Sequence, residues 1–197
     1  MGRIFTLFIF FVISQTNLNF AYSISPDVFI QSTVNRASQI LSENISKEEK
    51  INQLKIIAKE TVDIKGVGFY SLGTIRNDLN NEQINTYIDL FESYFLKSFS
   101  SRLAEYTNPE IEVKNKQTLN NNYTIVNSIL IATDKRPEIK IDWRVYTKNP
   151  ESPLIRDLII EGLSLARTQK EEFASILNSN DGDLKVLFKI LEDFSKN

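Results

Sequence analysis

The stretch RDLIIEGLSLARTQKEEF, from Arg156 to Phe173, decides the predicted fold because it places a strand, a turn and a helix in immediate succession. The apolar run from Leu158 to Ile160 is typical of a strand, and Glu161-Gly162 after it is typical of a turn. Thr168 followed by Glu171 predicts a capping box, in which two side chains bond the free backbone N–H groups at a helix start. We therefore expect a strand to end at this turn and a helix to begin just after Thr168.

Capping signals predict further helices before this stretch. Ser25-Pro26-Asp27 has the features of a helix start, and Ser46 and Asn80 are each followed three positions later by Glu or Gln, as in a capping box. Apolar residues at helical spacing follow each start. We expect helices over about residues 25–42, 46–62, 63–73 and 81–105.

Two glycines lie inside the third of these predicted helices. Gly66 and Gly68 each lower helix stability by about 1 kcal/mol relative to alanine. A glycine-rich phosphate loop is disfavoured because the pair does not follow a strand and lacks a third glycine. We expect instead that the glycines allow close packing against another helix.

The chain after residue 110 alternates between apolar and polar residues, as strands do. Turn signals at Asn120 to Asn122, Arg136-Pro137 and Asn149-Pro150 divide this region into segments. We expect strands over 111–119, 123–131, 139–146 and 154–161, then helices over 169–177 and 183–194. The predicted fold class is α+β, with a four-stranded, antiparallel and strongly curved sheet packed against a helical layer.

One face of the third predicted strand is apolar, and an aromatic row on the helix over residues 81–105 should face it. A curved sheet over helices has an interior that is either filled by side chains or left open, and the sequence allows both. An open interior would hold an apolar molecule. The residues predicted to line such a pocket are Phe91, Phe95, Ile129, Ile141, Trp143 and Val145.

The residue types of the chain exclude most catalytic and metal chemistry. The chain has no His and no Cys, which removes imidazole and thiolate groups as bases, nucleophiles or metal ligands. Asp157 and Glu161 would lie ~13 Å apart at ~3.3 Å per residue of strand, too far to share one proton. Nothing in the sequence brings Lys170 within reach of the Ser164 hydroxyl. We therefore predict no catalytic residue and no metal site.

The polar residues near the turn have structural interpretations as well. Glu161, Gly162 and Ser164 are predicted to form a joint between strand and helix, in which side chains bond backbone groups that would otherwise lack partners. Arg144 and Arg156 suit bidentate contact with a phosphate headgroup, but arginines in such positions more often form exposed ion pairs. Both interpretations of the two arginines stay open.

Residues 1–23 have the features of a secretory signal peptide. Arg3 is basic, Ile4 to Ile13 form an apolar run, and Ala21 and Ser23 provide small residues for cleavage. The run is well short of the roughly 20 residues that span a bilayer, so we expect cleavage and not a membrane anchor. The mature chain, residues 24–197, is predicted to form one domain. The full chain has a net charge of −2 at pH 7, which is too balanced for nucleic-acid binding.

The segment from Asp157 to Phe173 resembles the signature of the MlaC (toluene-tolerance) family of periplasmic phospholipid-binding proteins. The signature is D-[LV]-x-[IV]-E-G-[LVI]-S-[LM], followed after about six residues by E-F. The resemblance extends over most of residues 25–194 and includes IKIDWRVY at 139–146. The chain departs from the family at Lys170, where Arg is frequent, and at Ile75, where an aromatic residue is frequent. The matching positions are Asp157, Leu158, Ile160, Glu161, Gly162, Leu163, Ser164, Leu165, Glu172 and Phe173.

The resemblance implies a soluble, monomeric periplasmic carrier with a cone-shaped, NTF2-like fold. It further implies that phospholipid is the cargo and that no cofactor is required. The expected partners are an inner-membrane MCE-domain protein of an ABC transporter and an outer-membrane lipoprotein-porin complex. Lipid exchange between them would maintain the lipid asymmetry of the outer membrane.

Two alternatives remain open from the residues alone. The first is a small periplasmic enzyme on the same fold that uses Asp142, Asp157 or Glu161. It predicts one of these carboxylates deep in a polar cavity. The second is a scaffold that binds no lipid, and it predicts an interior filled by side chains.

Overall fold

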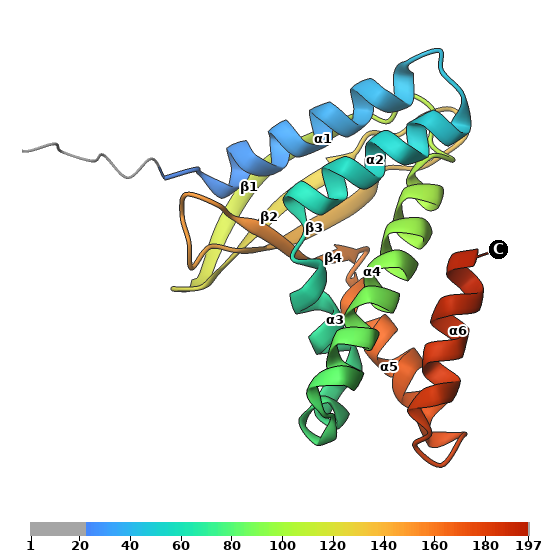
Figure 1. Cartoon of the computed structure of the whole chain (residues 1–197). Helices are drawn as coiled ribbons and strands as arrows, with labels where there is room; N and C mark the ends of the chain where they lie inside the picture. The colour runs from blue at the N-terminus through green and yellow to red at the C-terminus, as the bar shows by residue number, and fades with distance from the viewer. Residues whose placement is uncertain (1–22, 197) are drawn as a thin grey trace, which may run out of the picture.

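The computed structural model describes residues 23–196 and has the predicted α+β architecture (Figure 1). The predicted signal peptide falls almost entirely on residues 1–22, which lie outside the described residues, so it stays a prediction. Among the described residues, no helix combines the length and the apolar character that crossing a membrane requires.

The helices before the sheet begin where the capping signals predict. They are α1 (Pro26–Ser42), α2 (Lys47–Thr61), α3 (Ile64–Leu72), the 3-10 helix η1 (Gly73–Asp78) and α4 (Asn81–Leu103). The Ser46 hydroxyl accepts from the Glu49 N–H at 3.1 Å, and Asn80 and Gln83 form a reciprocal capping box at 2.9 and 3.0 Å. These side chains satisfy N–H groups that have no partner inside their helix.

Close packing explains Gly68. A Cβ atom at this position would lie 2.8 Å from Cδ1 of Phe91 on α4, which is closer than carbon atoms approach. The missing side chain also exposes the Gly68 carbonyl to the Tyr87 hydroxyl, which donates to it at 2.9 Å. Burial raises the pKa of Tyr87, so the hydroxyl stays protonated and able to donate. Gly68 thus sets the approach of α3 to α4, as predicted. The prediction is wrong for Gly66, where a Cβ atom would meet the Asp63 carboxylate that caps α3 and not another helix.

The sheet has five antiparallel strands in the order β1-β2-β3-β4-β5 and is not the four-stranded sheet that we predicted. The first four strands match the prediction closely. The fifth is a two-residue strand that folds back on β4 immediately after the turn. The strands are β1 (Ile111–Asn120), β2 (Tyr123–Leu130), β3 (Ile139–Tyr146), β4 (Leu154–Ile160) and β5 (Leu163–Ser164).

Because of β5, the following helix begins earlier than predicted. Helix α5 (Leu165–Asn178) is capped by Ser164, whose hydroxyl accepts from the Arg167 N–H at 3.1 Å. Thr168 lies inside the first turn, where its hydroxyl donates to the Ser164 carbonyl at 3.0 Å. The predicted Thr168 capping box is therefore wrong, because the chain has already turned into the helix when it reaches Thr168. The last helix, α6 (Leu184–Lys196), lies close to its predicted range.

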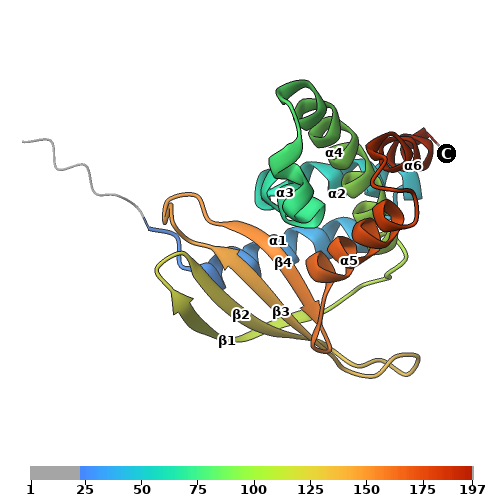
Figure 2. The same cartoon turned by 90° about the horizontal axis from the view of Figure 1, so that it is seen from below.

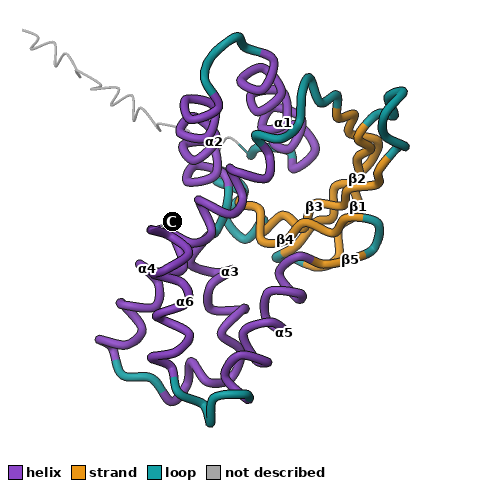
Figure 3. The backbone as a smooth tube through the Cα atoms, turned by 90° about the vertical axis from the view of Figure 1, so that its right-hand side faces the viewer, coloured by secondary structure: helices purple, strands orange, loops and turns teal. Residues whose placement is uncertain are grey.

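The elements form two groups (Figures 1 and 2). Helices α1 and α2 lie over one face of the sheet, whereas α3, α5 and α6 gather beyond its β4 edge (Figures 2 and 3). Helix α4 belongs to both groups, since it packs against α2 and also against α3 and α6. The interior between α1, α2, the last turns of α4 and the sheet contains an apolar cavity.

The prediction for Ile129 is wrong, because this residue lies on the face of the sheet turned away from α1 and α2. The buried residues of β2 are Thr124, Val126, Ser128 and Leu130, and Ile129 pairs instead with the exposed Lys140. The pattern misleads because the inner face carries a Thr and a Ser. Ser128 is fully bonded there: its hydroxyl donates to the Ile141 carbonyl at 3.0 Å and accepts from the Trp143 indole N–H at 2.8 Å.

Candidate functional site

An apolar cavity with a volume of about 130 Å³ lies between the helices and the inner face of the sheet. Its wall combines side chains from α1, α2, the end of α4 and the first four strands. The lining residues are Thr33, Val34, Ala37, Ser38 and Leu41 of α1, Leu54, Ile57, Thr61 and Val62 of α2 and its end, Phe99, Leu103, Tyr106 and Pro109 of α4 and the segment after it, and Ile111, Leu130, Ile139, Ile141, Trp143, Ile155, Leu158 and Ile160 of the sheet.

The polar groups of Thr33, Thr61 and Trp143 in this wall are hydrogen-bonded within the protein. The Thr33 hydroxyl donates to the Phe29 carbonyl at 2.9 Å, and the Thr61 hydroxyl donates to the Ile57 carbonyl at 2.7 Å. The Trp143 indole N–H is bonded to Ser128. These donors are therefore not available to a ligand, and the cavity offers a molecule mainly dispersion contacts and shelter from water.

The cavity is closed at one end and more open at the other. Thr33, Val34 and Ile155 are buried at the closed end. The lining residues that keep partial exposure gather where α1 and α4 end, where β1 and β3 begin and where β4 ends. They include Ser38, Leu103, Tyr106, Ile139 and Ile160. We call this region the open end of the cavity.

The structure brings only part of the predicted pocket together. Ile141 and Trp143 line the cavity, whereas Phe91 and Val145 are buried in the core away from it. Phe95 stacks between Phe91 and Phe99, with ring centroids 6.1 and 5.4 Å away, and only Phe99 reaches the cavity. The aromatic row on α4 therefore packs mainly within the helical group.

Sequence analysis missed the wall that α1 and α2 provide. The apolar stripes of these helices, such as Val34, Ala37 and Leu41, predict burial correctly. Helical spacing does not reveal whether a buried stripe meets other side chains or an unfilled space. The small residues Ala37 and Ser38 are the one local signal, because they leave volume where the neighbouring turns carry larger side chains.

Arg144 and Arg156 do not line the apolar cavity. They lie in a separate polar cleft of about 430 Å³ that also includes Arg76, Tyr123 and Asp157. Pairing with β2 places Arg144 opposite Ile125, on the outer face of the sheet and away from Trp143. A lipid whose chains occupy the cavity would thus have the sheet between it and these arginines.

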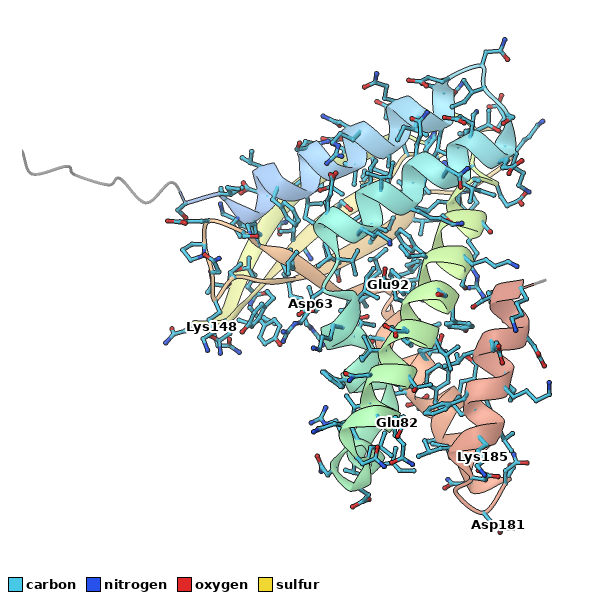
Figure 4. All side chains as sticks on the ribbon, viewed as in Figure 1. Asp63, Glu82, Glu92, Lys148, Asp181 and Lys185 are labelled. Carbon is cyan, nitrogen blue, oxygen red and sulfur yellow. The ribbon has the colours of Figure 1, made fainter. Side chains whose placement is uncertain are left out.

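Arg156 has a structural role in this cleft. Its Nε and Nη2 both lie 2.6 Å from Oδ2 of Asp63, and its Nη1 donates to the Tyr123 hydroxyl at 2.6 Å. The guanidinium also lies 3.8 Å from the centroid of the Tyr146 ring. Figure 4 shows Asp63 at the junction between α2 and α3. Arg156 therefore ties this junction to β4, and the ion-pair interpretation is the one that the geometry supports.

The predicted joint at Glu161, Gly162 and Ser164 is present, and its centre is Asp157. Glu161 and Gly162 adopt φ angles of 49° and 83° in the turn between β4 and β5. Asp157, 5% exposed, accepts from the Ser164 hydroxyl at 2.7 Å and from the Ala166 N–H at 3.0 Å. The Glu161 carboxylate accepts from the Lys140 N–H at 2.5 Å. The joint fixes the end of β4 against the start of α5.

The same contacts bear on the enzyme alternative. Asp142 accepts from the Asn127 amide at 2.6 Å, and Asp157 and Glu161 are bonded within the joint. None of these three carboxylates lines the apolar cavity, but the buried Asp157 does line the polar cleft, where both of its oxygens are bonded to Ser164 and Ala166 of the joint. Across residues 23–196, no group of three or more acidic residues is arranged to hold a metal ion.

Comparison with known proteins identifies the family. The family described as MlaC protein matches residues 31–193, which is most of the chain. The chain belongs to the MlaC family. The matched range contains the joint, the whole sheet and all of the residues that line the cavity. No curated protein matches the chain.

A solved structure has the same fold as this MlaC-family chain. It is described as a phospholipid-binding protein from Ralstonia solanacearum in complex with a phospholipid. The two share 18% sequence identity, and the TM-score is 0.74 over 88% of this chain and 98% of the other. The likeness confirms the fold.

Proposed function

We propose that this MlaC-family chain binds phospholipid and holds acyl chains in the apolar cavity. The observation that carries the proposal is the cavity itself, which has an apolar wall and satisfied donors at its closed end. Each methylene group moved from water into such a site contributes about 0.8 kcal/mol, so no catalytic or charged group is needed for affinity. Membership of the family and the fold shared with a phospholipid-binding protein support this ligand class.

The volume of the cavity is too small for a whole lipid. A protein cavity of roughly 150 Å³ holds one benzene molecule, and sites for larger ligands measure about 300–1,000 Å³. The present cavity, about 130 Å³, is therefore the closed form of the site and has room for only part of an acyl chain. Binding of a whole lipid requires the helices and the sheet to move apart.

We further propose that the protein carries lipid through the periplasm. In this proposal it exchanges lipid with an MCE-domain protein of an inner-membrane ABC transporter and with an outer-membrane lipoprotein-porin complex, and so maintains outer-membrane lipid asymmetry. The signal-peptide features of residues 1–23 support the location, and family membership supports the partners. The protein acts as a carrier in this proposal and not as an enzyme.

Lipid extraction and mass spectrometry of the purified protein test the first proposal. We expect co-purified phospholipid, and uptake of labelled phospholipid from vesicles after the native lipid is removed. Ala37→Phe adds a ring to the cavity wall and should reduce uptake several-fold, whereas Ala174→Phe, on the exposed side of α5, should leave uptake unchanged. A protein that carries no lipid and accepts none from vesicles would refute the proposal.

Transfer experiments test the carrier role separately. Loaded protein should deliver labelled phospholipid to a purified MCE-domain protein faster than to vesicles that lack it. Binding without faster delivery would leave a lipid-binding protein and would contradict the proposed partnership. Fractionation of cells that express the full chain should place the mature protein in the periplasm.

A further inference from the structure

A buried arginine nitrogen without a partner lies beside the open end of the cavity. Arg136 belongs to the loop between β2 and β3, and its guanidinium carbon lies 5.5 Å from the centroid of the Tyr106 ring, which is part of the cavity wall. Its Nη2 donates to the Ile131 carbonyl at 3.0 Å. Among the buried side-chain nitrogen and oxygen atoms of residues 23–196, Nε of Arg136 is the one without a hydrogen-bond partner.

An unsatisfied donor of this kind is unfavourable in an empty protein. A buried N–H group without an acceptor typically costs about 1–3 kcal/mol, and more when the group is charged. The Tyr106 ring below the guanidinium offers only a weak cation–π contact in place of an acceptor. Within the described part of the chain, no carboxylate forms an ion pair with Arg136, although the exposed Asp134 and Glu138 lie in the same loop. The Nε–H group of Arg136 therefore lacks an acceptor, and an anionic group would supply one.

The loop holds Arg136 in a defined position. The backbone N–H of Thr133 donates to the Arg136 carbonyl at 2.8 Å, and the Arg136 N–H donates to the Thr133 carbonyl at 3.1 Å. Pro137 follows directly and restricts the backbone further. Ile139, two residues beyond Pro137, lines the cavity at its open end. The guanidinium is thus presented at the boundary between an apolar interior and solvent.

We propose that Arg136 binds the phosphate group of the bound lipid while the acyl chains occupy the cavity. A guanidinium matches a phosphate oxyanion in geometry and charge and can donate two parallel hydrogen bonds to it, including one from the unpartnered Nε. This assignment rests on the proposed function. It gives the carrier a means to distinguish phosphate-bearing lipids from neutral lipids with the same chains.

Two lipids with identical acyl chains test the assignment, phosphatidylethanolamine and diacylglycerol, which lacks the phosphate. For the wild-type protein we expect tighter binding of the phospholipid. Arg136→Gln should weaken phospholipid binding about tenfold or more, which is the size of one charge-assisted hydrogen bond, and leave diacylglycerol binding unchanged. Arg136→Lys should retain part of the preference, because charge remains but the bidentate geometry is lost.

Arg144→Gln is the matched control, since Arg144 lies in the polar cleft on the other face of the sheet. It should leave the affinity for both lipids unchanged. Equal affinities of wild type and Arg136→Gln for the phospholipid, or an equal loss for both lipids, would overturn the assignment while lipid carriage stands. A wild-type protein that binds neither lipid would overturn both proposals.

Inorganic phosphate distinguishes the source of the oxyanion. If lipid phosphate is the ligand, inorganic phosphate alone should raise the melting temperature of the wild-type protein no more than it raises that of Arg136→Gln. A rise in the wild type alone would show a site for free phosphate and overturn the headgroup assignment. Because the Arg136 side chain is partly exposed, both variants should fold, and their melting temperatures in lipid-free buffer verify this.

Discussion

Single side chains at the joint determine how the sheet connects to α5. Asp157 is a buried carboxylate whose two oxygens have different donors, one a hydroxyl and one a backbone N–H. Arg144 lies 3.6 Å from the same carboxylate and adds a weaker attraction. In this MlaC-family chain the acidic residue that opens the signature is thus a structural centre, and its chemistry is that of an acceptor.

Asp157→Asn tests this role of the carboxylate. The substitution replaces one acceptor oxygen by an N–H donor, which would face either the Ala166 N–H or the Ser164 hydroxyl. We expect the free energy of unfolding to fall by about 1–3 kcal/mol. Urea unfolding measures the change, with Asp181→Asn in the exposed turn before α6 as the control. Equal effects of the two substitutions would contradict the role of Asp157.

Gly68 is a second position where the addition of one carbon atom should change the stability of the fold. In Gly68→Ala the gain of about 1 kcal/mol in helix propensity is opposed by overpacking against Phe91, which typically costs about 1–3 kcal/mol. Phe91 is only 1% exposed and has little room to move, so we expect a net loss of stability. Phe91→Leu in the same chain should reduce the cost of the Gly68 change. If the two changes were additive in thermal unfolding, the contact would not be the cause.

At the scale of elements, local signals predicted most of the fold. The caps at Ser46 and Asn80, the apolar stripes of α1 and α2 and the turns between strands were sufficient to place the helices and β1 to β4. The sequence does not reveal β5, because a strand of two residues shows no periodicity. It does not reveal which face of β2 is buried either, because the buried face carries Ser and Thr, which are typical of a solvent-exposed face. The inward-facing Ser128 accepts from the Trp143 indole N–H of the next strand, a contact that a local pattern does not contain.

The start of α5 gives the test at this scale. Ser164 caps the helix and also donates to Asp157, so Ser164→Ala should lower the free energy of unfolding by about 1–2 kcal/mol. Thr168 only bonds a carbonyl of the preceding turn, and Thr168→Ala should change stability by less than about 0.5 kcal/mol. Chemical denaturation of the two variants distinguishes a helix that begins after Ser164 from one that begins after Thr168. A larger loss for Thr168→Ala would favour the start that the capping-box pattern predicts.

At the scale of the whole molecule, the contacts of α1 indicate how the cavity could enlarge. The first turns of α1 are tied to β1: Lys116 binds Asp27 at 2.7 Å, and Gln31 accepts from the Val113 N–H at 3.2 Å. The Lys116 hydrogen bond lowers the pKa of Asp27 to about 2, so this tie is charged at neutral pH. The later turns of α1 contribute Ala37, Ser38 and Leu41 to the cavity wall, towards its open end. Loading with lipid should therefore separate α1 from the sheet mainly at that end.

Spin labels can measure this separation, because the chain has no Cys and two introduced cysteines carry the labels alone. One pair joins Gln39 near the end of α1 to Lys140 at the start of β3, both exposed, and its distance should increase when lipid-free protein takes up phospholipid. A second pair joins Glu82 to Lys185, which lie in the helical group away from the cavity (Figure 4), and should stay constant. If the first distance also stayed constant on loading, the chains would have to occupy a space other than this cavity, because about 130 Å³ does not hold them.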